Sequence, residues 1–149
     1  MTTKRPTLGL SRRAPAPEAR VRRSHEVKPV LQSGFRPDLK PESLAFALLG
    51  AANAVAQVRV QGVALPQALA TSFGVMQATP QARGAIQDLA YRTLRALGRS
   101  EALLALLAPK APEPPMLAAL VCCALALMEA GEGEGAPYEA FTVVDQAVT

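Results

Sequence analysis

The sequence predicts an all-α fold, and three observations support that class. Alanine and leucine dominate a chain of 149 residues that is 50% hydrophobic but only 4% aromatic, a composition typical of packed helices. Apolar residues recur at three- and four-residue steps over several segments, which is the period of a helix. Alternating β-branched runs and Asn-Gly or Asp-Gly turns are absent from the sequence, so nothing indicates a strand. We therefore expect about six helices.

Charge separates the first 40 residues from the rest of the chain. Residues 1–40 hold ten lysines and arginines against three acids, whereas residues 41–149 hold six bases against nine acids. Five prolines and sparse apolar residues predict that residues 1–40 form a disordered basic tail. Such a tail either contacts a polyanion or only keeps the protein soluble, and both interpretations stay open. Its paired arginines are candidate nucleic-acid contacts: Arg12, Arg13, Arg22 and Arg23.

Two helices are predicted after the tail. Residues 41–60 are apolar on nearly all sides, which predicts a central helix, and small residues around Gly50 leave room for a close neighbour. Gly62 is expected to end this helix. Residues 66–76 predict a second helix, and its expected inner face is Leu65, Leu69, Phe73 and Met76.

Residues 79–99 predict one long helix with a mark at each end. Thr79 suits the N-cap, Pro80 suits the first helical position, and Gly98 suits the C-cap. Its apolar positions define one buried face: Ile86, Leu89, Ala90, Thr93, Leu94 and Leu97. A second face carries four charged residues, because steps of three, four and seven return to nearly the same angle: Asp88, Arg92, Arg95 and Arg99.

Three further elements are predicted beyond the long helix. Ser100 is expected to cap a short helix over residues 101–107, whose leucines need cover on two sides. Prolines 109, 112, 114 and 115 predict a stiff connector. Residues 116–130 are very apolar and predict a core helix.

The C-terminal part of the sequence predicts a glycine-rich acidic loop over residues 131–135 and a last helix that Pro137 opens. The inward face expected for this helix is Tyr138, Phe141, Val144 and Val148. Because the sequence stops at Thr149 inside the helical pattern, we expect a fragment of a longer protein.

The sequence offers no catalytic or metal-binding constellation. Adjacent Cys122 and Cys123 cannot easily bridge, and we interpret them as apolar core residues of a protein from a reducing, cytoplasmic compartment. His25 lies alone in the tail, and neither a phosphate-binding glycine loop nor a nucleophile motif is present. The longest apolar run, residues 116–128, is shorter than the ~20 residues a membrane-spanning helix needs. We therefore expect a binding protein without a membrane anchor, a bound metal or activity of its own.

The candidate binding surface is the row Arg92, Arg95 and Arg99, called the arginine row below. One interpretation is contact with phosphates, which positions a nucleic acid without reading its sequence. The other is a solvated helix face on which Asp88 and Arg92 form an i,i+4 ion pair. Composition alone does not decide between them.

A family resemblance favours the first interpretation. The segment QDLAYRTLR at residues 87–95 resembles the Y-G-T-L-R helix of the RsmB/Sun (Fmu) type of ribosomal RNA cytosine methyltransferase, with Arg92 at the usual glycine. The segment FTVVDQAV at residues 141–148 resembles that family's V-N-x-A-V segment, with Asp145 at the usual asparagine. The order and spacing of the helices between them also agree. The resemblance covers residues 43–149 and lies in the family's N-terminal NusB-like domain.

The resemblance implies a NusB-like helical domain over residues 41–149 that docks small-subunit (16S-type) ribosomal RNA as a monomer. The expected partner is the protein's own C-terminal methyltransferase domain, which would bind S-adenosylmethionine and methylate carbon 5 of a cytosine. Cys122 and Cys123 do not correspond to that domain's catalytic cysteines, so this fragment is expected to need no cofactor. The alternative is a NusB-like transcription antitermination or protein-interaction module.

Overall fold

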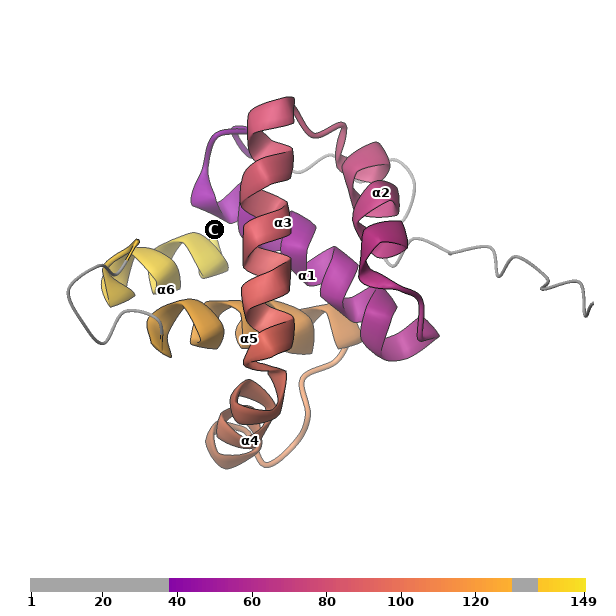
Figure 1. Cartoon of the computed structure of the whole chain (residues 1–149). Coiled ribbons are helices and arrows are strands. Elements are labelled where there is room, and N and C mark those ends of the chain that lie inside the picture. Colours follow the sequence, from indigo (N-terminus) through magenta and orange to yellow (C-terminus); the bar gives the residue numbers. More distant parts are fainter. Residues whose placement is uncertain (1–37, 130–136) are drawn as a thin grey trace, which may run out of the picture.

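The computed structural model describes residues 38–129 and 137–149, and every regular element within these ranges is a helix (Figure 1). The prediction of an all-α protein with about six helices is therefore confirmed for the described residues. The helices in chain order are α1 (Leu44–Gln61), α2 (Leu65–Met76), α3 (Pro80–Arg95), α4 (Leu97–Leu107), α5 (Pro115–Glu129) and α6 (Ala140–Val148). Most of the predicted tail and the glycine-rich loop lie outside the described residues.

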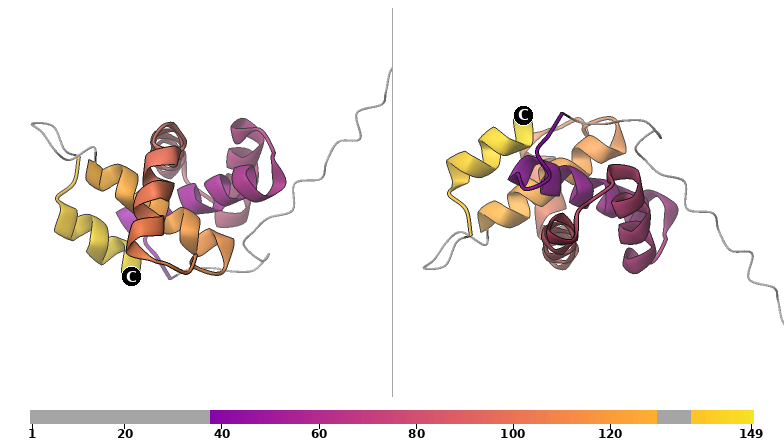
Figure 2. Two further views of the ribbon diagram at one scale, coloured as in Figure 1. Left: turned by 90° about the horizontal axis from the view of Figure 1, so that it is seen from below. Right: turned by 90° about the horizontal axis from the view of Figure 1, so that it is seen from above.

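Helix α1 is the centre of the bundle. It packs against α2, α3, α5 and α6, and Figure 2 shows these helices arranged around it. Residues 44–48 and 50–57 are all buried, so the predicted central position is confirmed. By length and composition α1 could also cross a membrane, but 72% of it is buried in the bundle, and the core helix of a soluble protein meets the same criteria. We did not identify α1 from the sequence as long and apolar enough to cross a membrane, because we considered only the longest uninterrupted apolar run, residues 116–128.

Local signals set both ends of α1. Ser43 Oγ accepts a hydrogen bond from the Phe46 amide at 3.2 Å, so the helix begins at Leu44 rather than at residue 41. Gly62 takes a left-handed conformation (φ 65°) and donates its amide to the Val58 carbonyl, as predicted for the end of the helix.

Gly50 lets α3 approach α1 closely. A Cβ atom at Gly50 would lie 2.6 Å from Ile86 Cδ1 and 3.1 Å from Met76 Sδ. The predicted close contact at this glycine is therefore present.

Helix α2 also presents its expected inner face, since Leu69 and Met76 are buried while Leu65 and Phe73 are half-buried.

The prediction of one helix over residues 79–99 is wrong at its C-terminal end. Thr79 caps α3 and Pro80 is its first residue, as predicted, and the core face is buried at Ile86 and Thr93. However, α3 ends at Arg95, because Ala96 leaves the helical conformation (φ −96°, ψ 4°).

Helix α4 then begins at Leu97, so Gly98 is not a C-cap and Ser100 is not an N-cap. Ser100 is instead buried, in a helix that packs against α5, which indicates that packing between helices overrides the two local cap signals. Leu106 and Leu107 are exposed, contrary to the expectation that all the leucines of this helix are covered.

Helix α5 crosses the bundle against α1, α3, α4 and α6, as predicted for the apolar segment. Cys122 and Cys123 are both buried and unbridged in it, which confirms their interpretation as core residues.

The prediction for α6 is wrong in its start and in its buried face. The helix begins at Ala140, three residues after Pro137. Its fully buried residue is Val143, and the Gln146 amide oxygen accepts from the Ala45 amide of α1 at 3.4 Å. The residues expected to face inward are the exposed ones: Tyr138, Phe141, Val144 and Val148.

Candidate nucleic-acid interface

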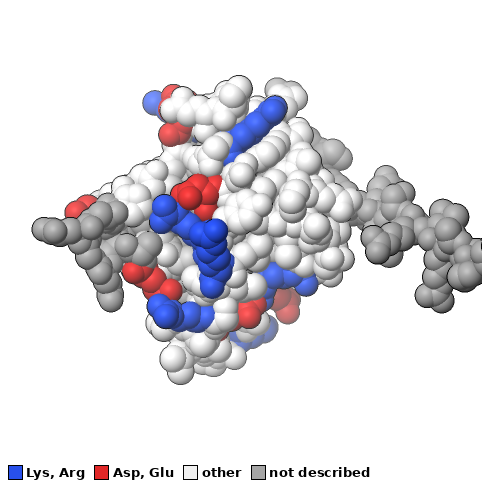
Figure 3. Space-filling view, viewed as in Figure 1, with Lys and Arg blue, Asp and Glu red and all other residues white. Residues whose placement is uncertain are grey.

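The arginine row is exposed on the side of α3 that faces away from α1. Arg92 and Arg95 lie in the last turn of α3, and Arg99 lies in the first turn of α4 rather than on α3 as predicted. All three residues are exposed, so none is covered by another helix. Figure 3 shows basic groups along this face, with acidic groups beside them and uncharged surface around them.

The three arginines differ in how strongly a carboxylate neutralises them. Arg92 Nε donates to Asp88 Oδ2 at 2.7 Å, which is the predicted i,i+4 pair. Arg99 Nη1 lies 3.9 Å from Glu129 Oε2 of α5, a long pair that the sequence did not indicate. Within residues 38–129 and 137–149, Arg95 forms no ion pair. Positive charge is therefore least compensated where α3 meets α4.

Two other arginines of the bundle are held by neighbouring groups. Arg59 of α1 forms an ion pair with Glu101 of α4. Arg83 donates to the Ala78 carbonyl at 3.0 Å and lies over the Phe73 ring, 5.7 Å from its centroid. These contacts join elements of the fold, so Arg59 and Arg83 hold the bundle together, whereas Arg95 of the arginine row has no such contact within residues 38–129 and 137–149.

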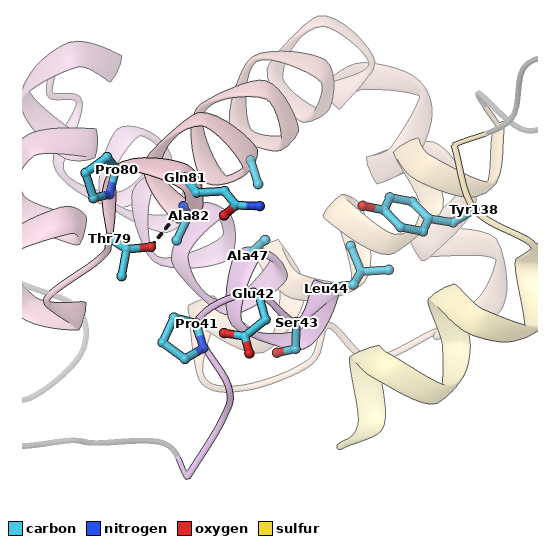
Figure 4. A pocket seen from close by; sticks show the side chains of 11 residues that line it. Pro41, Glu42, Ser43, Leu44, Ala47, Thr79, Pro80, Gln81, Ala82 and Tyr138 are labelled. Atoms are coloured by element: carbon cyan, nitrogen blue, oxygen red, sulfur yellow. Dashed lines mark hydrogen bonds between the residues drawn. The ribbon is translucent and has the colours of Figure 1, made fainter.

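A cavity of about 580 Å³ lies where the first turns of α1 and α3 approach each other (Figure 4). The phenol of Tyr138 points toward it, and Glu42 supplies its carboxylate. Its two cap hydroxyls are already engaged, because Ser43 accepts from the Phe46 amide and Thr79 from the Ala82 amide at 3.3 Å. Both hydroxyls stabilise helix ends, and the Ser43 hydroxyl donates its proton to the Lys40 carbonyl at 2.7 Å rather than to a base that would activate it as a nucleophile.

The two cysteine thiols of α5 are buried in the bundle. Burial raises the pKa of Cys123 to about 12 and also raises the pKa of Cys122, so both thiols stay protonated and unreactive near neutral pH. Among residues 38–129 and 137–149, no group of three His, Cys, Asp or Glu side chains could hold a metal. Arg12, Arg13, Arg22 and Arg23 lie outside the described residues, so their predicted role stays a prediction.

No protein-family model matches the chain, and neither a curated protein nor a solved structure shows a significant match to it.

Proposed function

We propose that this chain is an RNA-docking domain of a ribosomal RNA cytosine-C5 methyltransferase, with a NusB-like fold. The proposal combines the resemblance of residues 87–95 and 141–148 to that family with the exposure of the arginine row. In this function the bundle holds small-subunit ribosomal RNA by its phosphates, while a separate catalytic domain transfers the methyl group.

The observation that carries the proposal is the arginine row on a rigid support. Helix α3 is fixed by fully buried Ile86 and Ala90, so Arg92 and Arg95 project from a backbone that cannot easily move. Cations on a rigid helix hold RNA phosphates and release condensed counterions when the RNA binds. The same surface reads no sequence, so specificity would come from RNA shape and from the catalytic domain.

The donor of the methyl group would be S-adenosylmethionine, bound by the catalytic domain. Since the described residues form helices only, they contain no strand–loop–helix crevice of the kind in which Rossmann-like domains bind nucleotides. The chain would therefore contribute RNA affinity and positioning, and we expect no methyl transfer by this chain alone.

Fluorescence anisotropy with a labelled small-subunit ribosomal RNA fragment tests the proposal. The variants R95E/R99E and K40E/K110E each replace two exposed cations by two anions, but only the first changes the arginine row. We expect R95E/R99E to weaken binding at least about tenfold and K40E/K110E to change it by about twofold or less. Equal losses in the two variants would show that net charge alone attracts RNA, which would contradict the proposal.

A second candidate, a protein-interaction module, is supported by the outward face of α6. Phe141 and Val148 are 81% and 80% exposed, and Val144 is half exposed, so the helix presents one apolar side to solvent. Under the main proposal, the partner for this face is the methyltransferase domain itself. Sedimentation of the chain with the catalytic domain of an RsmB-type enzyme supplied in trans tests this docking.

The variants Phe141→Ser and Leu106→Ser allow a matched comparison in that experiment, since both replace an apolar side chain that is 81% exposed. Loss of association in the first variant only would assign the docking to α6. Association that neither variant changes, or no association of the wild-type chain, would remove α6 from the account.

A further inference from the structure

The surface is hollowed where α3 meets α4. A shallow hollow of about 400 Å³ is lined by Arg95, Ala96, Gly98 and Arg99. Arg95 is the last residue of α3 and Arg99 belongs to the first turn of α4, with non-helical Ala96 between the two helices. The two arginines therefore start from different helices and border one concave site.

Small residues leave the floor of the hollow open. A Cβ atom at Gly98 would meet no heavy atom within 4 Å, and the glycine is exposed. Ala96 contributes only a methyl group. A compact ligand can thus approach the backbone between the two long cationic side chains.

The electrostatics favour an anion in the hollow over one beside Arg92. The Arg99 side chain is 75% exposed, and its Glu129 partner at 3.9 Å lies at the limit of an ion pair. Arg95 has no ion-pair partner in the described ranges, whereas Asp88 holds Arg92 at 2.7 Å. An anion that binds in the hollow therefore has to compete only with the weak contact between Arg99 and Glu129. An anion that binds beside Arg92 has to displace the hydrogen-bonded Asp88 carboxylate.

We propose that the hollow binds one phosphodiester group of the RNA, with Arg95 and Arg99 on either side of it. This inference rests on the proposed RNA-docking function and assigns the contact to one place within the arginine row. A guanidinium is planar and presents a fork of donors that matches phosphate oxygens. The tetrahedral phosphorus directs its two non-bridging oxygens apart, so each can accept from a different arginine, whereas the coplanar oxygens of a carboxylate suit one fork.

Filling the hollow without changing charge tests the proposal. Gly98→Leu places a side chain in the hollow, and Gly84→Leu is its matched control, because Gly84 is also an exposed helical glycine with open space around it. Leucine is the better helix former, so both variants are expected to keep or raise the melting temperature. Gly98→Ala is a milder second variant, with the same expected direction, should leucine perturb the junction.

Anisotropy with the labelled RNA fragment, measured over a series of KCl concentrations, gives the outcomes. We expect Gly98→Leu to weaken binding by roughly tenfold and to lower the salt slope by about one, while Gly84→Leu stays within about twofold of wild type. If Gly98→Leu and Gly84→Leu bind equally while R95E/R99E binds weakly, the hollow is not the contact and the proposed function stands. If none of these variants weakens binding, both proposals fail. Displacement of the RNA by poly-glutamate at equal charge concentration would overturn the assignment to phosphate.

Discussion

Gly50 provides a quantitative test of the packing between α1 and α3. The substitution Gly50→Ala would place a Cβ 2.6 Å from Ile86 Cδ1, 2.8 Å from Ile86 Cγ1 and 3.1 Å from Met76 Sδ. Ile86 is completely buried, so it cannot move aside into solvent. Overpacking of this kind typically costs about 1–3 kcal/mol of unfolding free energy.

Alanine also favours the helix over glycine by about 1 kcal/mol, and this gain has to be separated from the clash. Gly84→Ala makes the same exchange in α3, where a Cβ meets no heavy atom within 4 Å. Because both variants gain helix propensity, the difference between them isolates the overpacking. We expect Gly84→Ala to stabilise the protein by about 0.5–1 kcal/mol and Gly50→Ala to be about 1–3 kcal/mol less stable than that variant.

Urea unfolding followed by far-ultraviolet circular dichroism measures both variants, and an unchanged m-value shows that the midpoints report stability. The double variant Gly50→Ala with Ile86→Val supplies a second reading, because valine lacks the Cδ1 atom. In the wild-type protein, Ile86→Val should lower the unfolding free energy by about 0.5–1.5 kcal/mol. In the Gly50→Ala variant the same substitution should cost less, because it removes part of the clash. Equal stability of Gly50→Ala and Gly84→Ala would refute the reasoning.

Three further predictions concern the core. Both polar side-chain atoms of buried Gln57 lack a hydrogen-bond partner among residues 38–129 and 137–149, so Gln57→Met should raise the unfolding free energy by about 1 kcal/mol in urea titrations; a loss would contradict this. Val143 is buried and Val144 half exposed, so thermal unfolding should show that Val143→Ala costs about 1.5–3 kcal/mol and Val144→Ala about 0.5 or less; a reversed order would overturn the orientation of α6. Because folding raises the pKa of Cys123 from 9.0 to about 12, only the unfolded thiol ionises in that interval, and stability should fall as pH rises from 9 to 12 by up to about 1.4 kcal/mol per pH unit. Cys123→Ala should show a shallower decline by chemical denaturation at each pH, and equal slopes would be the contrary result.

The sequence predicted the parts of the fold that depend on neighbouring residues. Thr79 and Pro80 begin α3, and Gly62 ends α1, because capping needs only a side chain or a backbone conformation within one turn. The central place of α1 was also predictable, since a helix without a polar face has to be covered on all sides.

The wrong predictions concern features that depend on packing between helices distant in sequence, namely where α3 ends and which side of α6 is buried. Gly98 was predicted to cap the long helix, but the helical conformation breaks at Ala96, two residues earlier. Gly98 then lies inside α4, which packs on α5. The apolar residues of α6 share one wide side, and its period could not tell that the bundle covers only one edge of that side, at Val143 and Ala147. In the structure Val143 is buried, and the Gln146 side chain accepts a hydrogen bond from Ala45 in the first turn of α1. These two contacts show which side of α6 faces the bundle.

The exposure of the arginine row was predictable from the sequence, but the shape of the surface around it was not. Exposure of Arg92 and Arg95 follows from their position opposite the core face of α3. The hollow depends on the break at Ala96, and the neighbour of Arg99 is Glu129 from α5, a residue distant in sequence. Neither feature has a signal in the periodicity of residues 79–99.

The salt dependence of RNA binding tests most directly the claim that the arginine row neutralises RNA phosphates. The whole chain and its R92A/R95A/R99A variant are titrated with the same small-subunit ribosomal RNA fragment over a series of KCl concentrations. Each phosphate contact contributes about 0.7–0.9 to the slope of log K against log salt, so the slope of the variant should be shallower by about 2. Parallel lines for the two proteins would contradict the account.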